Sequence, residues 1–146
     1  MLLLVNRGCN LRCSFCDLWE GKEHFPIEEI PKLLDDAVAI DTKVLVLTGG
    51  EPLLYPHIFT VIREAKERGL SVNMTTNGTL VERFWDDICA SNIDSLSLSI
   101  DGLTEVHDNL RGQKGAYQKT VRALKKLQEY GKIACSDLTR ILSLYQ

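Results

Sequence analysis

The sequence lacks the features of several specialised classes of protein. No apolar stretch approaches the roughly 18 residues that suggest a membrane helix, and the opening residues lack the basic start and cleavage site of a secretory signal. The formal charge of −3 provides no basic surface for nucleic acid. There is no linker, charge run or internal repeat that would divide the chain. These absences predict a soluble cytoplasmic protein with no membrane or nucleic-acid partner.

What is present is ordinary globular composition. The 146 residues are 45% hydrophobic and 25% charged, which argues against disorder, collagen and low complexity. A chain of this length has room for one domain and hardly for two. We therefore treat residues 1–146 as a single domain.

Short apolar runs alternate with longer periodic segments along the chain. Apolar residues in 27–40 follow the i, i+3, i+4 spacing of an amphipathic helix, whereas 43–47 is the continuous run expected of a strand buried on both faces. The pattern predicts strands at 2–6, 43–47, 70–76, 94–100 and 132–136, helices at 27–40, 57–68, 81–90 and 115–130, and a short last helix from Asp137.

This alternation predicts the α/β fold class. A β–α order repeated four times, followed by another strand, favours a parallel sheet with right-handed crossovers. Such a sheet is either open or curled into a partial TIM-type barrel. The chain supplies four clear βα units and the start of a fifth.

The predicted strand at 94–100 alternates strictly between apolar and hydroxyl side chains. If its apolar face packs on helices, Ser95, Ser97 and Ser99 face the concave interior, where branched apolar residues normally fill a barrel built only for stability. Three hydroxyls there suggest a polar ligand. The alternative is a strand at the edge of the sheet with its serines in water.

Distinctive loops follow four of the predicted strands. They contain cysteines, glycines and small polar residues, and they occupy 8–16, 48–52, 75–78 and 101–102. Ligands of parallel α/β sheets and barrels bind at the carboxyl ends of the strands. The shared position of these loops predicts the functional site at that edge.

The five cysteines do not resemble a disulfide framework. Their number is odd, and Cys9, Cys13 and Cys16 lie within eight residues of one another. In a reducing compartment, clustered thiols indicate a metal site or catalysis. Cys89 and Cys135 are expected to be buried small hydrophobes.

Three thiols are one ligand short of a closed four-ligand metal site. A structural zinc site would need a fourth ligand, for which His24 is the nearest candidate. An iron–sulfur cluster with three protein ligands would instead leave one iron open to a substrate or cofactor. Spacing alone leaves both alternatives open.

The segment Cys9-Asn-Leu-Arg-Cys13-Ser-Phe-Cys16 resembles the C-x3-C-x2-C signature of the radical S-adenosylmethionine (SAM) superfamily. Residues 48–52, Thr-Gly-Gly-Glu-Pro, resemble the GGEP motif of that family after its second strand. Segments 75–78, 99–102 and 107–112 are similar to the branch with the molybdenum-cofactor cyclase, the SPASM peptide-modifying enzymes and the anaerobic sulfatase maturases. The resemblance extends from about residue 2 to residue 130.

The resemblance implies a [4Fe–4S] cluster and SAM as cofactors. Cys9, Cys13 and Cys16 would each ligate one iron, and SAM would chelate the fourth through its amino and carboxylate groups. Phe15 would contact the adenine, largely through its backbone. Arg111 would pair with the SAM carboxylate, since a guanidinium matches a carboxylate in bidentate fashion.

The motif after the second strand is implied to hold the other end of SAM. Gly49 and Gly50 would let the chain approach the ligand without a Cβ. The Gly50 carbonyl and the region of Glu51 would receive the SAM ammonium group, although Glu51 also suits a capping carboxylate at a helix start. Ser99 would hydrogen-bond the ribose or the methionyl part.

The implied activity is that of a radical SAM enzyme. Reductive cleavage of SAM at the cluster would give a 5′-deoxyadenosyl radical, which abstracts hydrogen from an unknown substrate, a peptide or a small molecule. The partners would include SAM, that substrate and a reductant such as flavodoxin or ferredoxin. No separate set of acid–base or nucleophilic residues is implied.

Two rival interpretations remain at this stage. The radical SAM core usually has six βα units, and this chain has four to five, so it is expected to be incomplete on the C-terminal side. A truncated, non-catalytic remnant that still binds the cluster and SAM is therefore one alternative. The other is the structural zinc protein that uses the three cysteines and His24.

Overall fold

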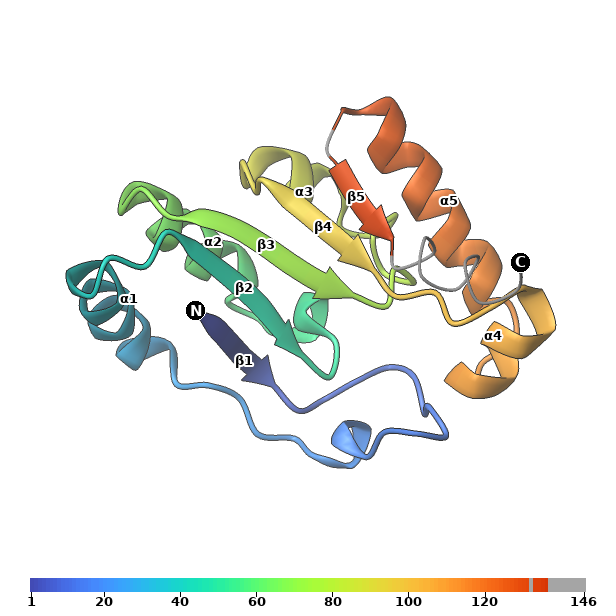
Figure 1. Ribbon diagram of the computed structural model, residues 1–146. Coiled ribbons are helices and arrows are strands. Elements are labelled where there is room, and N and C mark those ends of the chain that lie inside the picture. The colour runs from blue at the N-terminus through green and yellow to red at the C-terminus, as the bar shows by residue number, and fades with distance from the viewer. Residues whose placement is uncertain (132, 137–146) are drawn as a thin grey trace.

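A parallel five-stranded sheet forms the centre of the protein (Figure 1). The computed structural model describes residues 1–131 and 133–136. The strands are β1 (Leu2–Asn6), β2 (Val44–Gly49), β3 (Ser71–Thr76), β4 (Ser95–Leu98) and β5 (Ile133–Ser136), and each pairs in parallel with the next in chain order. Sequential order without reversal is the order of a barrel wall. The predicted α/β class, a parallel partial TIM-type barrel, is confirmed.

Helices connect successive strands. They are α1 (Ile30–Ala39), α2 (Ile58–Glu67), α3 (Trp85–Ala90), α4 (Thr104–Arg111) and α5 (Ala116–Glu129), with short 3-10 turns at Leu18–Glu20, Ile27–Glu29 and Pro52–Leu54. In Figure 1, α2 and α3 lie behind the strands, and α4 lies beyond their carboxyl ends. Among the described residues, no helix has the length and apolar content to cross a membrane.

Three helical segments differ from the prediction. The first turn of the predicted 27–40 helix is 3-10, and α3 begins at Trp85 because residues 79–84 form turns. The prediction missed α4 entirely. Its only buried side chain is His107, so it shows no apolar stripe in the sequence. The short helix predicted from Asp137 lies outside the described residues.

The two faces of the sheet differ sharply. The face toward the helices carries the core, where Leu45, Val72 and Leu96 are fully buried. On the opposite face Asn73, Ser95 and Ser97 are half-buried, and the Asn73 amide donates to the Ser95 hydroxyl at 2.6 Å. Because β4 lies between β3 and β5, the edge-strand interpretation of its serines is wrong. The serines face the side that the helices leave open.

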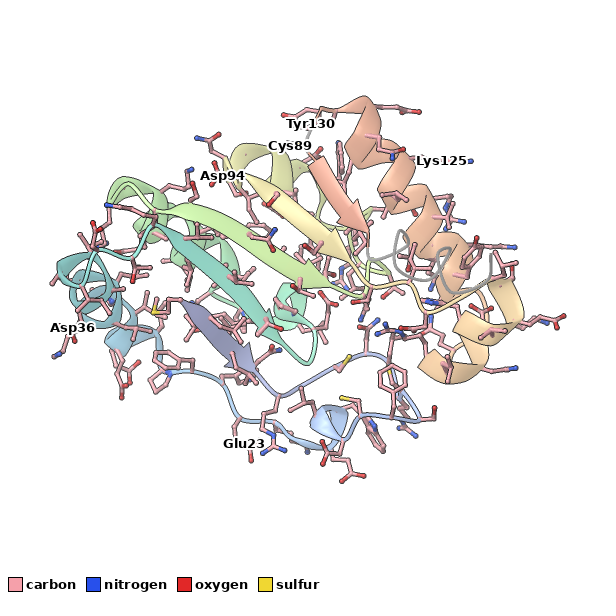
Figure 2. All side chains as sticks on the ribbon, viewed as in Figure 1. Glu23, Asp36, Cys89, Asp94, Lys125 and Tyr130 are labelled. Carbon is pink, nitrogen blue, oxygen red and sulfur yellow. The ribbon has the colours of Figure 1, made fainter. Side chains whose placement is uncertain are left out.

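Cys89 lies apart from the other described cysteines. It belongs to α3, near Tyr130 and Asp94, at the end of the sheet where β4 begins (Figure 2). Its side chain is only partly buried, so the expectation of a buried hydrophobe is wrong for Cys89. The side chain of Cys135 lies outside what the structure describes.

Candidate cluster and cofactor site

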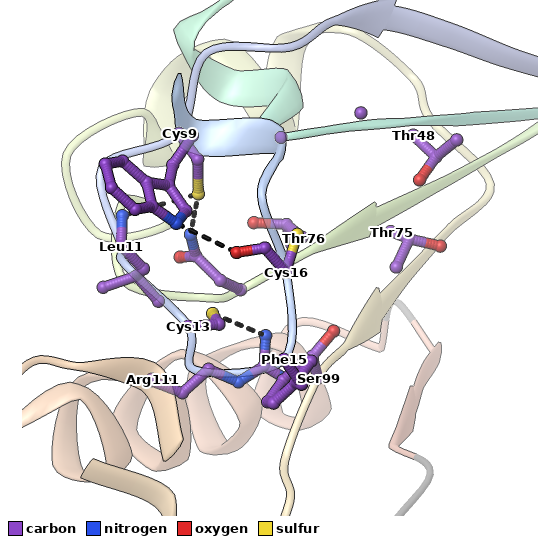
Figure 3. Close-up of a pocket in the computed structure, with 14 residues that line it drawn as sticks. Cys9, Leu11, Cys13, Phe15, Cys16, Thr48, Thr75, Thr76, Ser99 and Arg111 are labelled. Carbon is purple, nitrogen blue, oxygen red and sulfur yellow. Dashed lines mark hydrogen bonds between the residues drawn. The ribbon is translucent and has the colours of Figure 1, made fainter. Parts of the chain in front are cut away.

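The loops that follow β1, β2, β3 and β4 meet around one cavity of about 130 Å³ (Figure 3). Its lining includes eight of the nine predicted site residues: Cys9, Cys13, Phe15, Cys16, Gly49, Gly50, Ser99 and Arg111. Leu11, Trp19, Thr48, Thr75, Thr76 and Asn77 complete it. Segments up to about 100 residues apart in the chain are thus brought to the carboxyl edge of the sheet. The remaining predicted residue, Glu51, does not line the cavity.

The loop after β1 that carries the cysteines is anchored at both of its halves. Leu11 is almost fully buried between Cys9 and Cys13. The Cys16 backbone N–H donates to the Cys13 carbonyl at 3.2 Å, and the Trp19 indole N–H donates to the Cys16 carbonyl at 2.9 Å. The guanidinium of Arg12 lies over the Trp19 ring, 5.2 Å from its centroid. The loop is therefore ordered by its own residues as well as by its neighbours.

Two of the three sulfur atoms receive N–H donors. Cys9 Sγ accepts from the Leu11 backbone N–H at 3.4 Å and from the Asn77 amide at 3.8 Å, and Cys13 Sγ accepts from Arg111 Nη1 at 3.9 Å. Burial raises the pKa of both thiols, whereas the Leu11 N–H at Cys9 and the Arg111 cation at Cys13 lower it. Metal ligation requires the thiolate, and these donors stabilise it. The donor set fits an iron–sulfur cluster with three protein ligands.

The two glycines of the 48–52 motif are required by chain packing. A Cβ on Gly50 would lie 2.3 Å from the carbonyl oxygens of Arg7 and Gly8, and one on Gly49 would lie 2.4 Å from the Asn6 carbonyl oxygen. The Gly50 and Glu51 backbone N–H groups donate to Asn6 and Gly8 carbonyls, both at 2.9 Å. Glycine was expected at these positions because it leaves room for the ligand. The structure gives a stronger reason, since the β2 loop packs directly against the start of the cysteine loop.

Glu51 is fully buried and its carboxylate is bound within the protein. It accepts from the backbone N–H groups of Leu53 at 3.1 Å and Asn77 at 2.9 Å, and from the Thr76 hydroxyl at 2.7 Å. Burial raises the pKa of this carboxyl group, while the three donors oppose that rise. Glu51 thus caps the turn at Pro52–Leu54, as one interpretation of the sequence had it, and joins the β2 and β3 loops.

Arg111, the last residue of α4, faces the cavity. Its Nε and Nη2 donate to the two carboxylate oxygens of Asp101 at 2.5 and 2.8 Å, and its guanidinium lies 5.3 Å from the centroid of the Phe15 ring. The Phe15 side chain is 59% exposed. The predicted residues Arg111 and Phe15 are therefore neighbours across the cysteine loop and α4.

Ser99 lies at the cavity, one step beyond β4. Its backbone N–H donates to the Thr76 carbonyl at 3.1 Å, so the backbone of the β4 loop follows that of β3. Ser95 and Ser97 contact Asn73 instead and do not line the cavity. Of the three hydroxyls predicted to face a ligand, the structure brings only Ser99 to the cysteines.

Sequence reasoning missed two contributors to the site. Asn77 was interpreted as part of an Asn-Gly turn, yet its amide donates to Cys9 Sγ and, at 3.0 Å, to Asn10 Oδ1. Asp101 was predicted to follow Ser95, Ser97 and Ser99 on the same face of the strand, but no interaction was predicted for its carboxylate. The signal available for both was their position directly after a strand, at the edge where the cysteines lie.

His24 is not brought to the cysteines. It pairs with Asn6 in an isolated antiparallel bridge and stacks on Tyr55, with 5.9 Å between the ring centroids. It does not line the cavity. Within the described part of the chain, no group of three or more His, Cys, Asp or Glu side chains is arranged to hold a single metal ion. The structural zinc interpretation therefore loses its fourth ligand.

Fold and site together define an α/β protein of partial-barrel type with a three-cysteine loop at the carboxyl edge of its sheet. The sequence model of the Radical SAM superfamily matches residues 3–142. The chain belongs to the radical SAM superfamily, as the cysteine and GGEP motifs predicted.

Individual relatives agree with this assignment and with the predicted branch. The AdoMet-dependent heme synthase of Methanosarcina barkeri is 34% identical over 131 residues, which are 86% of this chain and 38% of the relative. The GTP 3′,8-cyclase of Chlorobaculum tepidum is 31% identical over 130 residues, 86% of this chain and 39% of the relative. Streptococcus suis SuiB, solved with its precursor peptide SuiA, superposes with a TM-score of 0.78 at 22% identity, covering 92% of this chain and 31% of SuiB.

These relatives bear on cofactors and on length. Members of the superfamily are enzymes that use a [4Fe–4S] cluster and SAM, and SuiB has also been solved with SAM bound. The predicted cofactors are confirmed for the family. The chain spans between 31% and 39% of the length of the three relatives described above.

Proposed function

We propose that this chain is a radical SAM iron–sulfur enzyme, or the part of one that holds the cluster and SAM. The observation that carries the proposal is the convergence of Cys9, Cys13 and Cys16 with Arg111 and Ser99 on one cavity. A site built only for structure has no need of a hydroxyl and of a cation with N–H groups beyond its ion pair with Asp101 beside three thiols. The family assignment supplies the cofactors that suit this set.

Each residue has a role that follows from its place. Cys9, Cys13 and Cys16 ligate three irons, and the N–H donors at Cys9 and Cys13 stabilise the thiolates. Arg111 binds the SAM carboxylate with the N–H groups that Asp101 and Cys13 leave free. Ser99 hydrogen-bonds the ribose or methionyl part of SAM.

The β1 and β2 loops bind the rest of SAM. Phe15 contacts the adenine, largely through its backbone, and its residue is 59% exposed at the cavity. The Gly50 carbonyl accepts from the SAM ammonium. Glu51 acts on SAM only indirectly, because its carboxylate is committed to Leu53, Thr76 and Asn77. Its part is to fix the loop that carries Gly50.

When bound, the cluster and SAM would supply the one-electron reductive cleavage of SAM to methionine and a 5′-deoxyadenosyl radical, which would abstract hydrogen from a peptide or small-molecule substrate. The electron comes from a reductant such as flavodoxin or ferredoxin. The named activities of the relatives include small-molecule synthases and cyclases, and SuiB takes a precursor peptide. A peptide and a small molecule are therefore both proposed as substrate classes.

Anaerobic reconstitution tests the proposal. We expect about four irons and four sulfides per chain, as a cubane cluster requires, and 5′-deoxyadenosine from SAM and dithionite. Cys13→Ala should lose both. Cys89→Ala is the matched control, because Cys89 lies outside the cavity, and it should retain both.

The same experiment separates the alternatives. A chain that holds the cluster and binds SAM but yields no 5′-deoxyadenosine is the non-catalytic cofactor-binding protein. One zinc per chain without acid-labile sulfide would overturn both and restore the zinc interpretation.

A further inference from the structure

Asp101 and Arg111 form a bidentate ion pair at the rim of the cavity. Asp101 stands just after β4, and Arg111 ends α4, with Nε–Oδ2 and Nη2–Oδ1 distances of 2.5 and 2.8 Å. Only 12% of the Arg111 side chain and 26% of the Asp101 side chain are exposed. A paired, largely desolvated guanidinium holds one orientation, unlike a surface arginine.

The same guanidinium reaches the cysteine loop. Arg111 Nη1 donates to Cys13 Sγ at 3.9 Å. The loop is fixed on this side by its backbone, since the Ser14 N–H donates to the Leu110 carbonyl at 2.9 Å. A Cβ on Gly112 would lie 2.5 Å from the Arg12 carbonyl oxygen. The end of α4 and the middle of the cysteine loop are therefore in direct contact.

His107 fixes the third side of this arrangement. Its ring is fully buried and packs edge-on against Tyr117, and its Nδ1 accepts the Asp101 backbone N–H at 3.2 Å. The hydrogen bond sets the backbone of Asp101, and through it the direction of the carboxylate toward Arg111.

Arg111 has more N–H donors than Asp101 and Cys13 engage. The guanidinium has five N–H groups; Asp101 engages two and Cys13 one, which leaves two for an anionic group in the cavity. We propose that Asp101 is a positioning residue that acts through Arg111: it holds the guanidinium on the Cys13 sulfur and thereby raises the reduction potential of the bound cluster. This inference rests on the proposed function.

The sign of the effect separates positioning from simple charge. Hydrogen bonds to the cluster sulfurs and nearby positive charge stabilise the reduced cluster and raise its potential. Asp101 itself is negative, so if its charge acted alone, its removal would raise the potential. If it acts by holding Arg111 on Cys13, its removal lowers the potential, because the hydrogen bond is lost.

The test is a redox titration of the reconstituted chain, followed by EPR of the reduced cluster. We expect Asp101→Ala and Arg111→Gln each to shift the midpoint potential to more negative values, and the double variant to go no further than Arg111→Gln. Asp35→Ala is the matched control. Asp35 also pairs with an arginine, accepting from Arg68 Nε at 2.7 Å, but this pair does not line the cavity. Its potential should equal that of the wild type.

Arg111→Lys is the second variant, for the case in which Asp101→Ala holds no cluster. Lysine keeps the charge but lacks the planar fork that serves two partners, so positioning predicts a lower potential here too. An unchanged potential in Arg111→Lys, or an unchanged or higher one in Asp101→Ala, overturns the inference. A wild-type chain that takes up no cluster overturns the proposed function, and the inference with it.

SAM binding supplies an independent readout. At metal sites, the loss of a residue that orients a ligating side chain typically costs about 10- to 100-fold in metal affinity or activity. By analogy, Asp101→Ala should weaken SAM binding about tenfold or more, as measured by isothermal titration. Equal affinity in Asp101→Ala and wild type would contradict the view that Asp101 orients the cavity-facing N–H groups.

Discussion

The cysteine loop is held from two sides, and the chemistry of the two sides differs. On the side of β2 and β3 the closest contacts are between backbones, since Gly50 leaves no room for a Cβ, and the buried Glu51 binds the two strand loops together. The side chain that reaches Cys9 Sγ there is the neutral amide of Asn77. On the side of β4 and α4, the backbone contact between Ser14 and Leu110 is joined by a charged side chain, Arg111, which is paired with Asp101.

The two sides should therefore differ in what a substitution changes. Close backbone contacts tolerate almost no added volume, so changes on the β2–β3 side should reduce the free energy of unfolding. An ion pair beside a sulfur can be altered with little change in volume. Changes to the Asp101–Arg111 pair should therefore alter the electrostatics of the site more than the stability of the fold.

The largest expected effect on stability comes from Gly50→Ala. Its Cβ would lie 2.3 Å from two carbonyl oxygens of the cysteine loop, so one of the two loops must shift. We expect a loss of about 3 kcal/mol or more in the free energy of unfolding, the upper range for overpacking. Urea denaturation followed by circular dichroism measures it.

Gly69→Ala is the control for that change. Gly69 has φ +77° but no atom within 4 Å of its ideal Cβ, so only the backbone cost of about 1–2 kcal/mol applies. Equal losses in the two variants would contradict the close packing of the β2 loop against the cysteine loop.

Glu51→Gln should have the next largest effect. The carboxylate accepts from three donors while fully buried. An amide in its place turns one acceptor into a donor and leaves one of the three partners unsatisfied. The expected loss is about 2 kcal/mol, measured by the same denaturation.

Glu82→Gln is the matched control for the carboxylate. Glu82 pairs with Arg122 at the surface, where both side chains are about half exposed, and exposed pairs contribute about 0–1 kcal/mol. A Glu51→Gln variant as stable as Glu82→Gln would show that the buried carboxylate does not join the two loops.

The sequence was informative wherever a local pattern determines the structure. The alternation in 94–100 predicted that Leu96 and Leu98 pack in the core, and the loops after the strands predicted the edge where the cysteines meet. Contacts between distant segments were not predictable in this way. Arg111 and Cys13 are 98 residues apart, and no spacing rule connects them.

Two residues show why local patterns were insufficient. Asn77 fits an Asn-Gly turn whether or not its amide reaches Cys9, so the turn signal hid the contact. His107 sits in a helix with no other buried residue, so neither the helix nor the histidine's burial produced a periodic signal. In both cases tertiary packing supplied what the sequence pattern lacked.

The smallest expected effect is a pH dependence from His107, on the β4–α4 side. Burial and the nearby Arg111 cation lower the pKa of its imidazole below the ordinary 6.5. The unfolded chain therefore binds a proton at higher pH than the folded one does, so the contribution of His107 to stability is full above about pH 6.5 and falls as the pH drops toward the folded pKa.

The variant His107→Asn can still accept from the Asp101 N–H but does not titrate, so its melting temperature should fall less between pH 7.5 and pH 5.5 than that of the wild type. His57→Asn, at the exposed start of α2, should retain the wild-type dependence. If the melting temperature of His107→Asn fell as much as that of the wild type, protonation of the ring that contacts Asp101 would not be the cause of the pH dependence. The stability of the β4–α4 side would then not depend on the charge of this residue.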